Sequence, residues 1–152
     1  MTRVLVTETE LSVADMLTEL PPQVSSGVYG VGVDIASVER IKLAINRSGE
    51  RFLNFVYSKN EQEYCESAEK KFERYSACWA AKESAVKALG TGFRYSISFK
   101  DIELQSGKDG RPLLKLSGRF QQLMQEKSVN YSHVSISHEG ESAVAVVMLC
   151  RI

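Results

Sequence analysis

The sequence predicts an α+β domain in which an antiparallel sheet packs against one long helix. Helical periodicity prevails in the earlier part of the chain, whereas alternation of apolar and polar residues prevails near its end. This order of elements is typical of α+β proteins. Small residues also recur at spacings of three and four on the predicted long helix, which lets that helix pack closely against a sheet or another helix. The length of 152 residues suits one domain with a full core.

Residues 1–27 are predicted to form a separate N-terminal extension, and residues 28–152 form the domain itself. Within the extension, weak alternation over 2–8 indicates a short strand. A short helix is expected over 12–20, where the two prolines at 21–22 end it. The composition of the extension does not decide what it does.

The first half of the domain is expected to hold one strand followed by helices. Ser37 is a candidate N-cap, Ser58 and Glu61 form a capping-box pattern, and Gly90 is a usual helix end. The predicted elements are, in order, a strand over 28–35, a helix over 38–49, a helical segment over 51–58, a helix that begins after Ser58, and a long helix over 72–89 that follows a polar interval at 67–71.

The second half of the domain is expected to be mostly strand. Alternation over 131–138 and over 142–150, with three residues between them, predicts an antiparallel hairpin. The other predicted elements are a strand over 96–105 with a change of register at Lys100–Asp101, a turn over 108–112, a strand over 113–118 and a helix over 119–127.

Composition and charge exclude several classes of protein. Lysine plus arginine equals aspartate plus glutamate, at 19 each, which argues against nucleic-acid binding because such domains carry a basic excess. No apolar run is long enough to span a membrane, and the N-terminus lacks the apolar core of a secretory signal. Cys65, Cys78 and Cys150 form no paired motif, so we expect reduced, buried thiols in a cytoplasmic protein.

Several polar residues are candidates for chemistry, and each also has an ordinary structural interpretation. Asp34 follows two glycines near the end of a predicted strand, where it is either a turn or capping residue or a ligand of a hard cation such as Mg²⁺. Glu83 and Lys87 lie four residues apart on the long helix, beside Trp79. They form either a surface pair or part of a site that is partly buried.

Two further segments also have both a structural and a functional interpretation. Gly90 and Gly92 after the long helix act as a helix stop, or they bring backbone amides to a phosphate or a nucleobase. His138 lies at a strand end next to Ser137, where it is either structural or a group that binds phosphate or moves protons.

Taken together and in this order, four segments resemble the 4′-phosphopantetheinyl transferases, and among them the short holo-[acyl-carrier-protein] synthase type. The segments are VGVDIASVER (31–40), RYSACWAAKESAVKALGTG (74–92), DIEL with DGRPLLKLSG (101–104 and 109–118), and HVSISHEGESAVAVV (133–147). The resemblance covers roughly residues 29–149 and implies the α+β fold of these transferases.

The resemblance implies an enzyme that moves 4′-phosphopantetheine from coenzyme A to a serine of an apo acyl carrier protein and releases adenosine 3′,5′-bisphosphate. It also implies that Asp34 and Glu83 are magnesium ligands, with the pyrophosphate of coenzyme A and water completing the shell. Lys87 matches a lysine near the phosphates. Either Lys87 or Glu83, through a bound water, takes the serine proton.

The same resemblance implies further contacts with coenzyme A. The candidate residues are Arg74, Lys82, Lys87, Gly90, Gly92, Ser137 and His138. We expect Arg74 and His138 at the phosphates of the nucleotide, with Ser137 assisting. We expect the two glycines near the adenosine.

The expected assembly is a homotrimer. Ala36 occupies the position at which the larger family members carry a third carboxylate, which favours the short type. In those larger members the serine–histidine element and the carboxylate-bearing elements belong to different halves, and this chain has the length of one half. The resemblance therefore implies that His138 of one subunit faces Asp34 and Glu83 of a neighbour.

The carrier protein is expected to dock through acidic residues. Residues 37–51 carry four basic and two acidic side chains, a local excess of +2 in a neutral chain, and they directly follow Asp34. The candidate residues are Arg40, Lys42, Arg47 and Arg51. An ordinary solvated helix face is the alternative interpretation. The carrier belongs to fatty-acid, polyketide or peptide synthesis, and the sequence does not choose among them.

Two other functions stay open at this point. One is a non-catalytic subunit with the same fold that binds a carrier protein or a nucleotide. The other is a different magnesium-dependent phosphotransferase. The presence of Asp34, Glu83 and Lys87 together favours catalysis.

Overall fold

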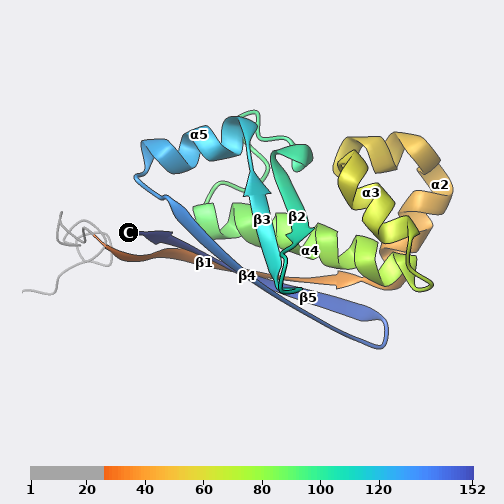
Figure 1. Cartoon of the computed structure of the whole chain (residues 1–152). Helices are drawn as coiled ribbons and strands as arrows, with labels where there is room; N and C mark the ends of the chain where they lie inside the picture. The colour runs from red at the N-terminus through yellow and green to blue at the C-terminus, as the bar shows by residue number, and fades with distance from the viewer. Residues whose placement is uncertain (1–25) are drawn as a thin grey trace, which may run out of the picture.

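Alternation of apolar residues along three segments produces an antiparallel sheet of three strands (Figure 1). In the computed structural model, which describes residues 26–152, the strands are β1 (Gly27–Ser37), β4 (Tyr131–Glu139) and β5 (Ser142–Arg151), in the order β1-β5-β4. Asp34 pairs with Ala145, and His138 pairs with Ala143. Because side chains alternate with period two, all four share the inner face of the sheet. The predicted hairpin is confirmed.

Helix α4 (Lys71–Leu89) lies on the inner face of this sheet, with its backbone directly against β1. A Cβ atom on Gly32 would lie 1.9 Å from the carbonyl oxygen of Ser84, and one on Gly30 would lie 2.1 Å from that of Ala88. Both glycines are therefore required by the close approach of the helix, and the small residues predicted to line the helix permit it.

Helices α2 (Val38–Val56) and α3 (Lys59–Glu66) lie together at one end of α4 (Figure 1). The two helical segments predicted over 38–58 form one element, which is kinked at Gly49, where φ is 52°. The capping box predicted at the start of α3 is confirmed. The backbone amide of Ser58 donates to Glu61 Oε2 at 2.9 Å, and the amide of Glu61 donates to Ser58 Oγ at 3.2 Å.

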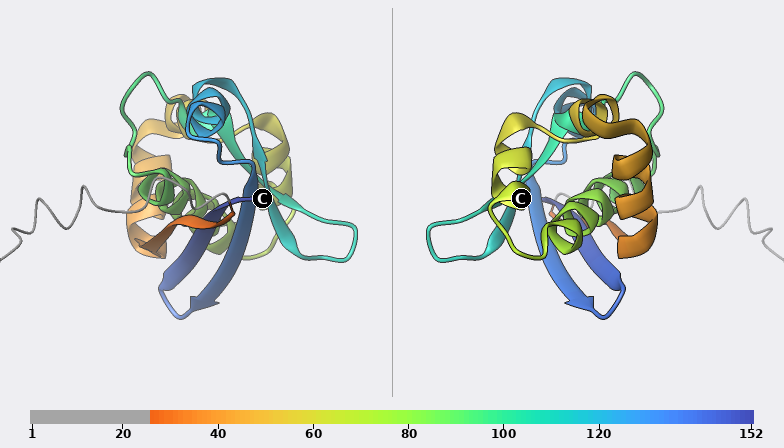
Figure 2. Two further views of the ribbon diagram at one scale, coloured as in Figure 1. Left: turned by 90° about the vertical axis from the view of Figure 1, so that its left-hand side faces the viewer. Right: turned by 90° about the vertical axis from the view of Figure 1, so that its right-hand side faces the viewer.

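A second sheet contains only β2 (Ile102–Ser106) and β3 (Pro112–Leu116), which pair antiparallel and precede α5 (Gly118–Glu126). The strand predicted over 96–105 was wrong for its first six residues. Ser96 has a positive φ of 64°, and 99–101 forms a turn of 3₁₀ helix. Figure 2 shows that the β2–β3 and β4–β5 hairpins project from the body in different directions.

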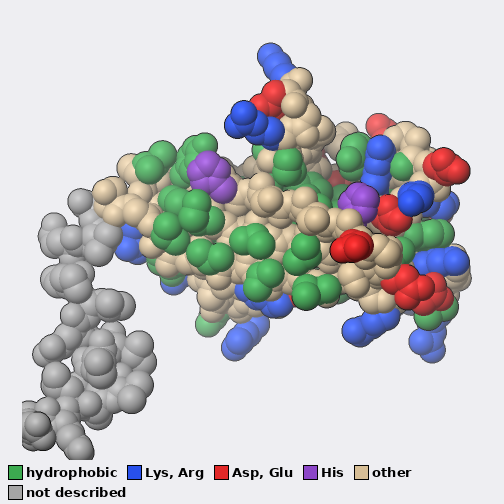
Figure 3. All heavy atoms as spheres, turned by 90° about the horizontal axis from the view of Figure 1, so that it is seen from below, with side chains coloured by type: hydrophobic (Ala, Val, Ile, Leu, Met, Phe, Trp, Pro, Cys, Tyr) green, Lys and Arg blue, Asp and Glu red, His purple; other side chains and the backbone are tan. Residues whose placement is uncertain are grey.

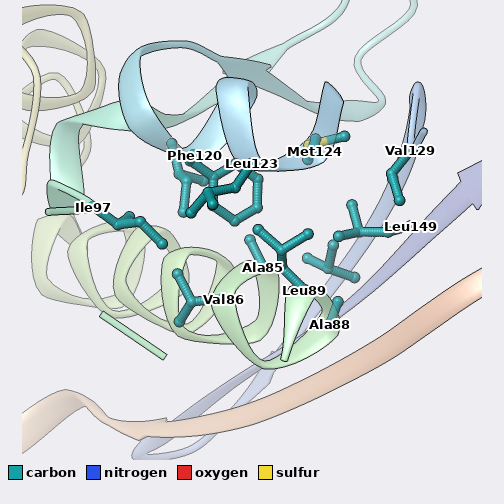
Figure 4. Packing of buried hydrophobic residues seen from close by; sticks show 12 residues of the cluster. Ala85, Val86, Ala88, Leu89, Ile97, Phe120, Leu123, Met124, Val129 and Leu149 are labelled. Atoms are coloured by element: carbon teal, nitrogen blue, oxygen red, sulfur yellow. The ribbon is translucent and has the colours of Figure 1, made fainter. Parts of the chain in front are cut away.

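The core between α4 and α5 fixes the position of the long helix (Figure 4). Phe120 and Leu123 of α5 point toward Val86 and Leu89 of α4, and Leu149 of β5 completes this part of the cluster. All five side chains are buried. Burial of such side chains stabilises a fold by about 1.5–3 kcal/mol each, so this cluster anchors the C-terminal half of α4.

The N-terminal strand and helix predicted over 2–20 lie outside the described residues, as does most of the extension over 1–27. Among residues 26–152, no helix is both long and apolar enough to cross a membrane. Cys65, Cys78 and Cys150 are buried free thiols, as expected.

Replacement of Gly32 by alanine tests the contact between β1 and α4. The added methyl group would overlap the carbonyl oxygen of Ser84, so we expect a loss of about 3 kcal/mol in the free energy of unfolding. Chemical denaturation followed by circular dichroism measures it. Gly140→Ala is the control, because Gly140 has a positive φ but no atom within 4 Å, and it should lose only about 1 kcal/mol. Equal losses in the two variants would contradict the close contact.

Candidate active site

A cavity of about 460 Å³ opens between β1, α2 and α4, and it brings Asp34 and Glu83 together. Asp34 lies on the inner face of β1, two residues beyond Gly32, and so projects toward α4. Glu83 precedes Ser84, whose carbonyl contacts that glycine. The close approach of strand and helix therefore places the two predicted carboxylates in one cavity.

The two carboxylates of this cavity have different surroundings. Lys87 Nζ donates to Asp34 Oδ1 at 2.8 Å and to the carbonyl oxygen of Val33 at 3.0 Å, one turn of helix from Glu83. Burial raises the pKa of Glu83, the charge of Asp34 raises it further, and Lys87 acts in the opposite direction. The lining of the cavity thus holds two carboxylates and the guanidinium of Arg40, while the ammonium of Lys87 is bound to Asp34.

The donor set of this cavity fits magnesium. Mg²⁺ is usually bound through one or two carboxylates, with substrate phosphates and water completing the shell. In the described part of the chain, no three histidine, cysteine or acidic side chains are grouped to hold a metal. Asp34 and Glu83 would therefore supply two oxygen ligands to such an ion and leave the other positions to a substrate and water.

Aromatic side chains form the apolar wall of the same cavity. Trp79 lies one turn before Glu83 and stacks between Phe52, at a centroid distance of 6.1 Å, and Phe99, at 5.1 Å. Phe52 and Trp79 both line the cavity. This wall explains why the carboxylate of Glu83 is only partly solvated, as the position of Trp79 in the sequence predicted.

A second cavity, of about 450 Å³, brings Arg74 and His138 together. It lies between the first half of α4, the β2–β3 sheet and the inner face of β4. Arg74 Nη1 donates to the carbonyl oxygen of Tyr64 at 2.6 Å and to Ser67 Oγ at 3.2 Å, which fixes the guanidinium at the cavity wall. Lys70 and Glu73 also line this cavity, and sequence reasoning did not identify either residue.

The two cavities open on different sides of α4. Glu83 follows Arg74 by nine residues, which at about 100° per residue is two and a half turns of helix. Their side chains therefore project from opposite sides and are separated by roughly 14 Å along the axis. Within one subunit, the expected magnesium ligands and the expected nucleotide-binding residues do not meet.

Lys82 takes a position that contradicts its expected contact with coenzyme A. Its side chain is fully enclosed, and Nζ lies 2.9 Å from Oε2 of Glu61, which is equally buried. The ammonium also donates to the carbonyl oxygens of Phe99 and Ile102. Because all of these partners are internal, Lys82 holds α3, α4 and the start of β2 together and does not face either cavity.

Three further candidates line neither cavity. Ser137 pairs with Val144 on the outer face of the sheet, opposite to the face that carries His138. Gly90 ends α4 in the left-handed conformation, with φ 79°, and Gly92 follows it, at the opposite end of the helix from Arg74. One subunit therefore does not bring Ser137, Gly90 or Gly92 to the residues expected at the nucleotide.

The basic side chains of α2 are spread along the helix. Arg40 lines the cavity of Asp34 and Glu83. Lys42 lies 5.9 Å from the centroid of the Phe72 ring and borders a different hollow near the β4–β5 turn. Arg47 and Arg51 are exposed. Arg40 is the one member of this predicted group that lines the cavity of the two carboxylates.

Comparisons with known proteins find relatives that belong to one family. The family model of the 4′-phosphopantetheinyl transferase superfamily matches residues 30–147. A holo-[acyl-carrier-protein] synthase of Halothermothrix orenii is 43% identical over 121 residues, which cover 80% of this chain and 96% of that protein.

Solved structures of similar proteins have the same fold. The holo-[acyl-carrier-protein] synthase of Neisseria meningitidis has a TM-score of 0.75 at 28% identity, and the alignment covers 81% of this chain and 98% of that one. The holo-[acyl-carrier-protein] synthase of Helicobacter pylori, in complex with coenzyme A, has a TM-score of 0.68 at 30% identity over 78% and 98% of the two chains. The resemblance identified from the four sequence segments is confirmed, and the chain belongs to the 4′-phosphopantetheinyl transferase superfamily as an enzyme of the holo-[acyl-carrier-protein] synthase type.

Proposed function

We propose that this enzyme transfers 4′-phosphopantetheine from coenzyme A to a serine of an apo acyl carrier protein, depends on Mg²⁺, and releases adenosine 3′,5′-bisphosphate. The observation that carries the proposal is the shared cavity of Asp34 and Glu83, with Lys87 bound to Asp34. Oxygen ligands beside a fixed ammonium group suit the transfer of a phosphate-linked group. The coenzyme A complex of the Helicobacter pylori relative supports the choice of donor.

Asp34, Glu83 and Lys87 each have a role in the proposed transfer. Asp34 and Glu83 hold the magnesium ion, which when bound stabilises charge on the phosphate oxygens of the substrate. Lys87 contributes a positive charge at a position fixed by Asp34 and the carbonyl oxygen of Val33. Because the ammonium of Lys87 is already engaged, we assign the acceptance of the serine proton to Glu83 through a water molecule.

The second cavity is the proposed site of the nucleotide. Arg74 and His138 offer charge-assisted hydrogen bonds to phosphate, and Leu104 and Pro112 add apolar surface for a base. Arg74 and His138 therefore keep the role in nucleotide binding that the sequence predicted for them. Lys82, Ser137, Gly90 and Gly92 are left out of this site because none of them lines the cavity in the structure.

We propose that a neighbouring subunit joins the two cavities. Arg74 and Glu83 project from opposite sides of α4, so one molecule of coenzyme A reaches both kinds of group only between subunits. The outer face of the three-stranded sheet offers the interface, because its apolar side chains are exposed: Val31 by 59%, Val33 by 52% and Ile35 by 69%. Figure 3 shows hydrophobic side chains gathered along this side of the molecule. A homotrimer is the assembly that the family resemblance favours.

The carrier protein is proposed to dock at Arg40. This side chain lies on the first turn of α2, and it lines the cavity that holds Asp34 and Glu83. An acidic carrier surface at this position would bring its serine close to the two carboxylates. Lys42, Arg47 and Arg51 extend the positive charge along the helix and steer the approach of the carrier. The three free thiols suit a cytoplasmic location.

Incubation with coenzyme A, Mg²⁺ and a panel of apo carrier proteins tests the proposed reaction. We expect mass spectrometry to show the addition of phosphopantetheine to one serine of the carrier, and we expect chelation of the metal to abolish it. Glu83→Gln should retain less than about 1% of the activity, because it removes a charged ligand but keeps the shape of the side chain. Absence of any mass gain across fatty-acid, polyketide and peptide carriers would favour a non-catalytic binding subunit instead.

Arg40→Glu tests the docking of the carrier. Reversal of this charge should raise the Michaelis constant for the carrier by about five- to tenfold and leave that for coenzyme A nearly unchanged. Steady-state kinetics with each substrate varied in turn measure both constants. Arg119→Glu on α5 is the control, since it reverses a charge that is paired only with neighbours on its own helix. Equal increases in the two constants would place Arg40 outside the carrier interface.

Val146→Glu tests the proposed interface between subunits. Val146 lies on the outer face of the central strand β5 and is 39% exposed, and a carboxylate buried there in an assembly would be unpaired. We expect monomers in analytical ultracentrifugation and a loss of activity of at least about tenfold. The control is Leu113→Glu on β3, where the leucine is 41% exposed but lies outside this sheet. A fully active monomer would contradict the shared site.

A further inference from the structure

A carboxylate in the lining of the second cavity lies close to two of its basic side chains. Oε1 of Glu73 lies 3.5 Å from Nζ of Lys70, and Oε2 lies 3.6 Å from Nδ1 of His138. All three residues line the cavity together with Arg74. The side chain of Glu73 is only 22% exposed, whereas those of Lys70 and His138 are 76% and 59% exposed. The carboxylate is therefore more enclosed than either of these two basic side chains.

The position of Glu73 is not explained by helix formation alone. An acidic residue in the first turn of α4 interacts favourably with the helix dipole, and any orientation of its side chain toward solvent would serve that purpose. Here the side chain also faces His138, which comes from β4, more than sixty residues later in the chain. The contact between α4 and β4 places a negative charge where an anionic ligand would need positive charge.

We propose that Glu73 is a built-in competitor of the nucleotide and sets the affinity of this cavity for phosphate. The inference rests on the proposed binding of the nucleotide at Arg74 and His138. In the free enzyme the carboxylate pairs with Lys70 and His138. A bound phosphate takes over these two groups, and the carboxylate is left beside a like charge. Arg74 is held by Tyr64 and Ser67 instead, so it stays available to the ligand in both states.

This competition has a consequence for turnover. A phosphate group that binds to Lys70 and His138 displaces the contacts of both with Glu73, and departure of the nucleotide restores these contacts. Glu73 therefore weakens the binding of coenzyme A and of adenosine 3′,5′-bisphosphate alike, and it speeds the release of the bisphosphate. The effect is electrostatic, so it acts on ligands that carry phosphate and leaves the binding of the uncharged nucleoside unchanged.

Glu73→Gln in the full-length enzyme tests this role by isothermal titration calorimetry. We expect adenosine 3′,5′-bisphosphate to bind about three- to tenfold more tightly than to the wild type, and the affinity for adenosine to stay the same. In steady-state assays the Michaelis constant for coenzyme A and kcat should both fall, because the product leaves more slowly. Glu69→Gln is the matched control, since Glu69 is exposed, lies four residues earlier and does not line the cavity.

Other outcomes separate this inference from the proposed function. Unchanged or weaker binding of the bisphosphate to Glu73→Gln would show that the carboxylate orients His138 or has no role, and would overturn the inference alone. Failure of the wild-type enzyme to bind the bisphosphate would overturn the assignment of the cavity, and the inference with it. If a thermal melt shows that Glu73→Gln is unfolded, Glu73→Asp replaces it in the test. The shorter side chain keeps the charge at the start of the helix but moves it away from His138. Glu73→Asp should still bind the bisphosphate more tightly than the wild type.

Discussion

The backbone of β1 lies directly against the backbone of α4, and the shared cavity of Asp34 and Glu83 depends on that contact. Gly30 and Gly32 leave no side chain between the strand and the carbonyl oxygens of the helix. Asp34 follows on the same face of the strand, and Glu83 lies beside the contact on the helix. Any larger residue at position 32 would move the strand away from the helix and separate the two carboxylates. The glycines thus position the charged groups through backbone packing.

A buried ion pair holds the other side of the same helix. Lys82 and Glu83 are neighbours in sequence, but a step of about 100° turns one side chain into the interior and the other into the cavity. Glu61 forms an ion pair with the ammonium of Lys82 and also accepts a hydrogen bond from the backbone amide of Leu104, at 2.9 Å. Loss of either partner would leave a buried charge without compensation, which is strongly destabilising. The pair therefore joins three elements and fixes the rotation of α4 that presents Glu83.

Local signals in the sequence predicted most of the fold, and contacts between distant segments decided the rest. The capping box of Ser58 and Glu61 and the end of α4 at Gly90 depend on a few neighbouring residues, so the sequence was sufficient to find them. The start of β2 was missed because residues before it have positive φ, which their side chains do not reveal. Lys82 was misassigned because its partner, Glu61, is visible only after α3 and α4 pack together.

The candidate site shows the same division between local and distant information. Alternation along β4 already places Ser137 and His138 on opposite faces, so the sequence contained the reason to separate them. The pairing of His138 with Glu73 required the tertiary structure. A coenzyme A molecule carries a diphosphate and a separate 3′-phosphate, and the groups proposed to bind them, at Glu83 and Arg74, project from opposite sides of α4. Because these two faces of the helix point away from each other, the proposed site would take one face from each of two subunits.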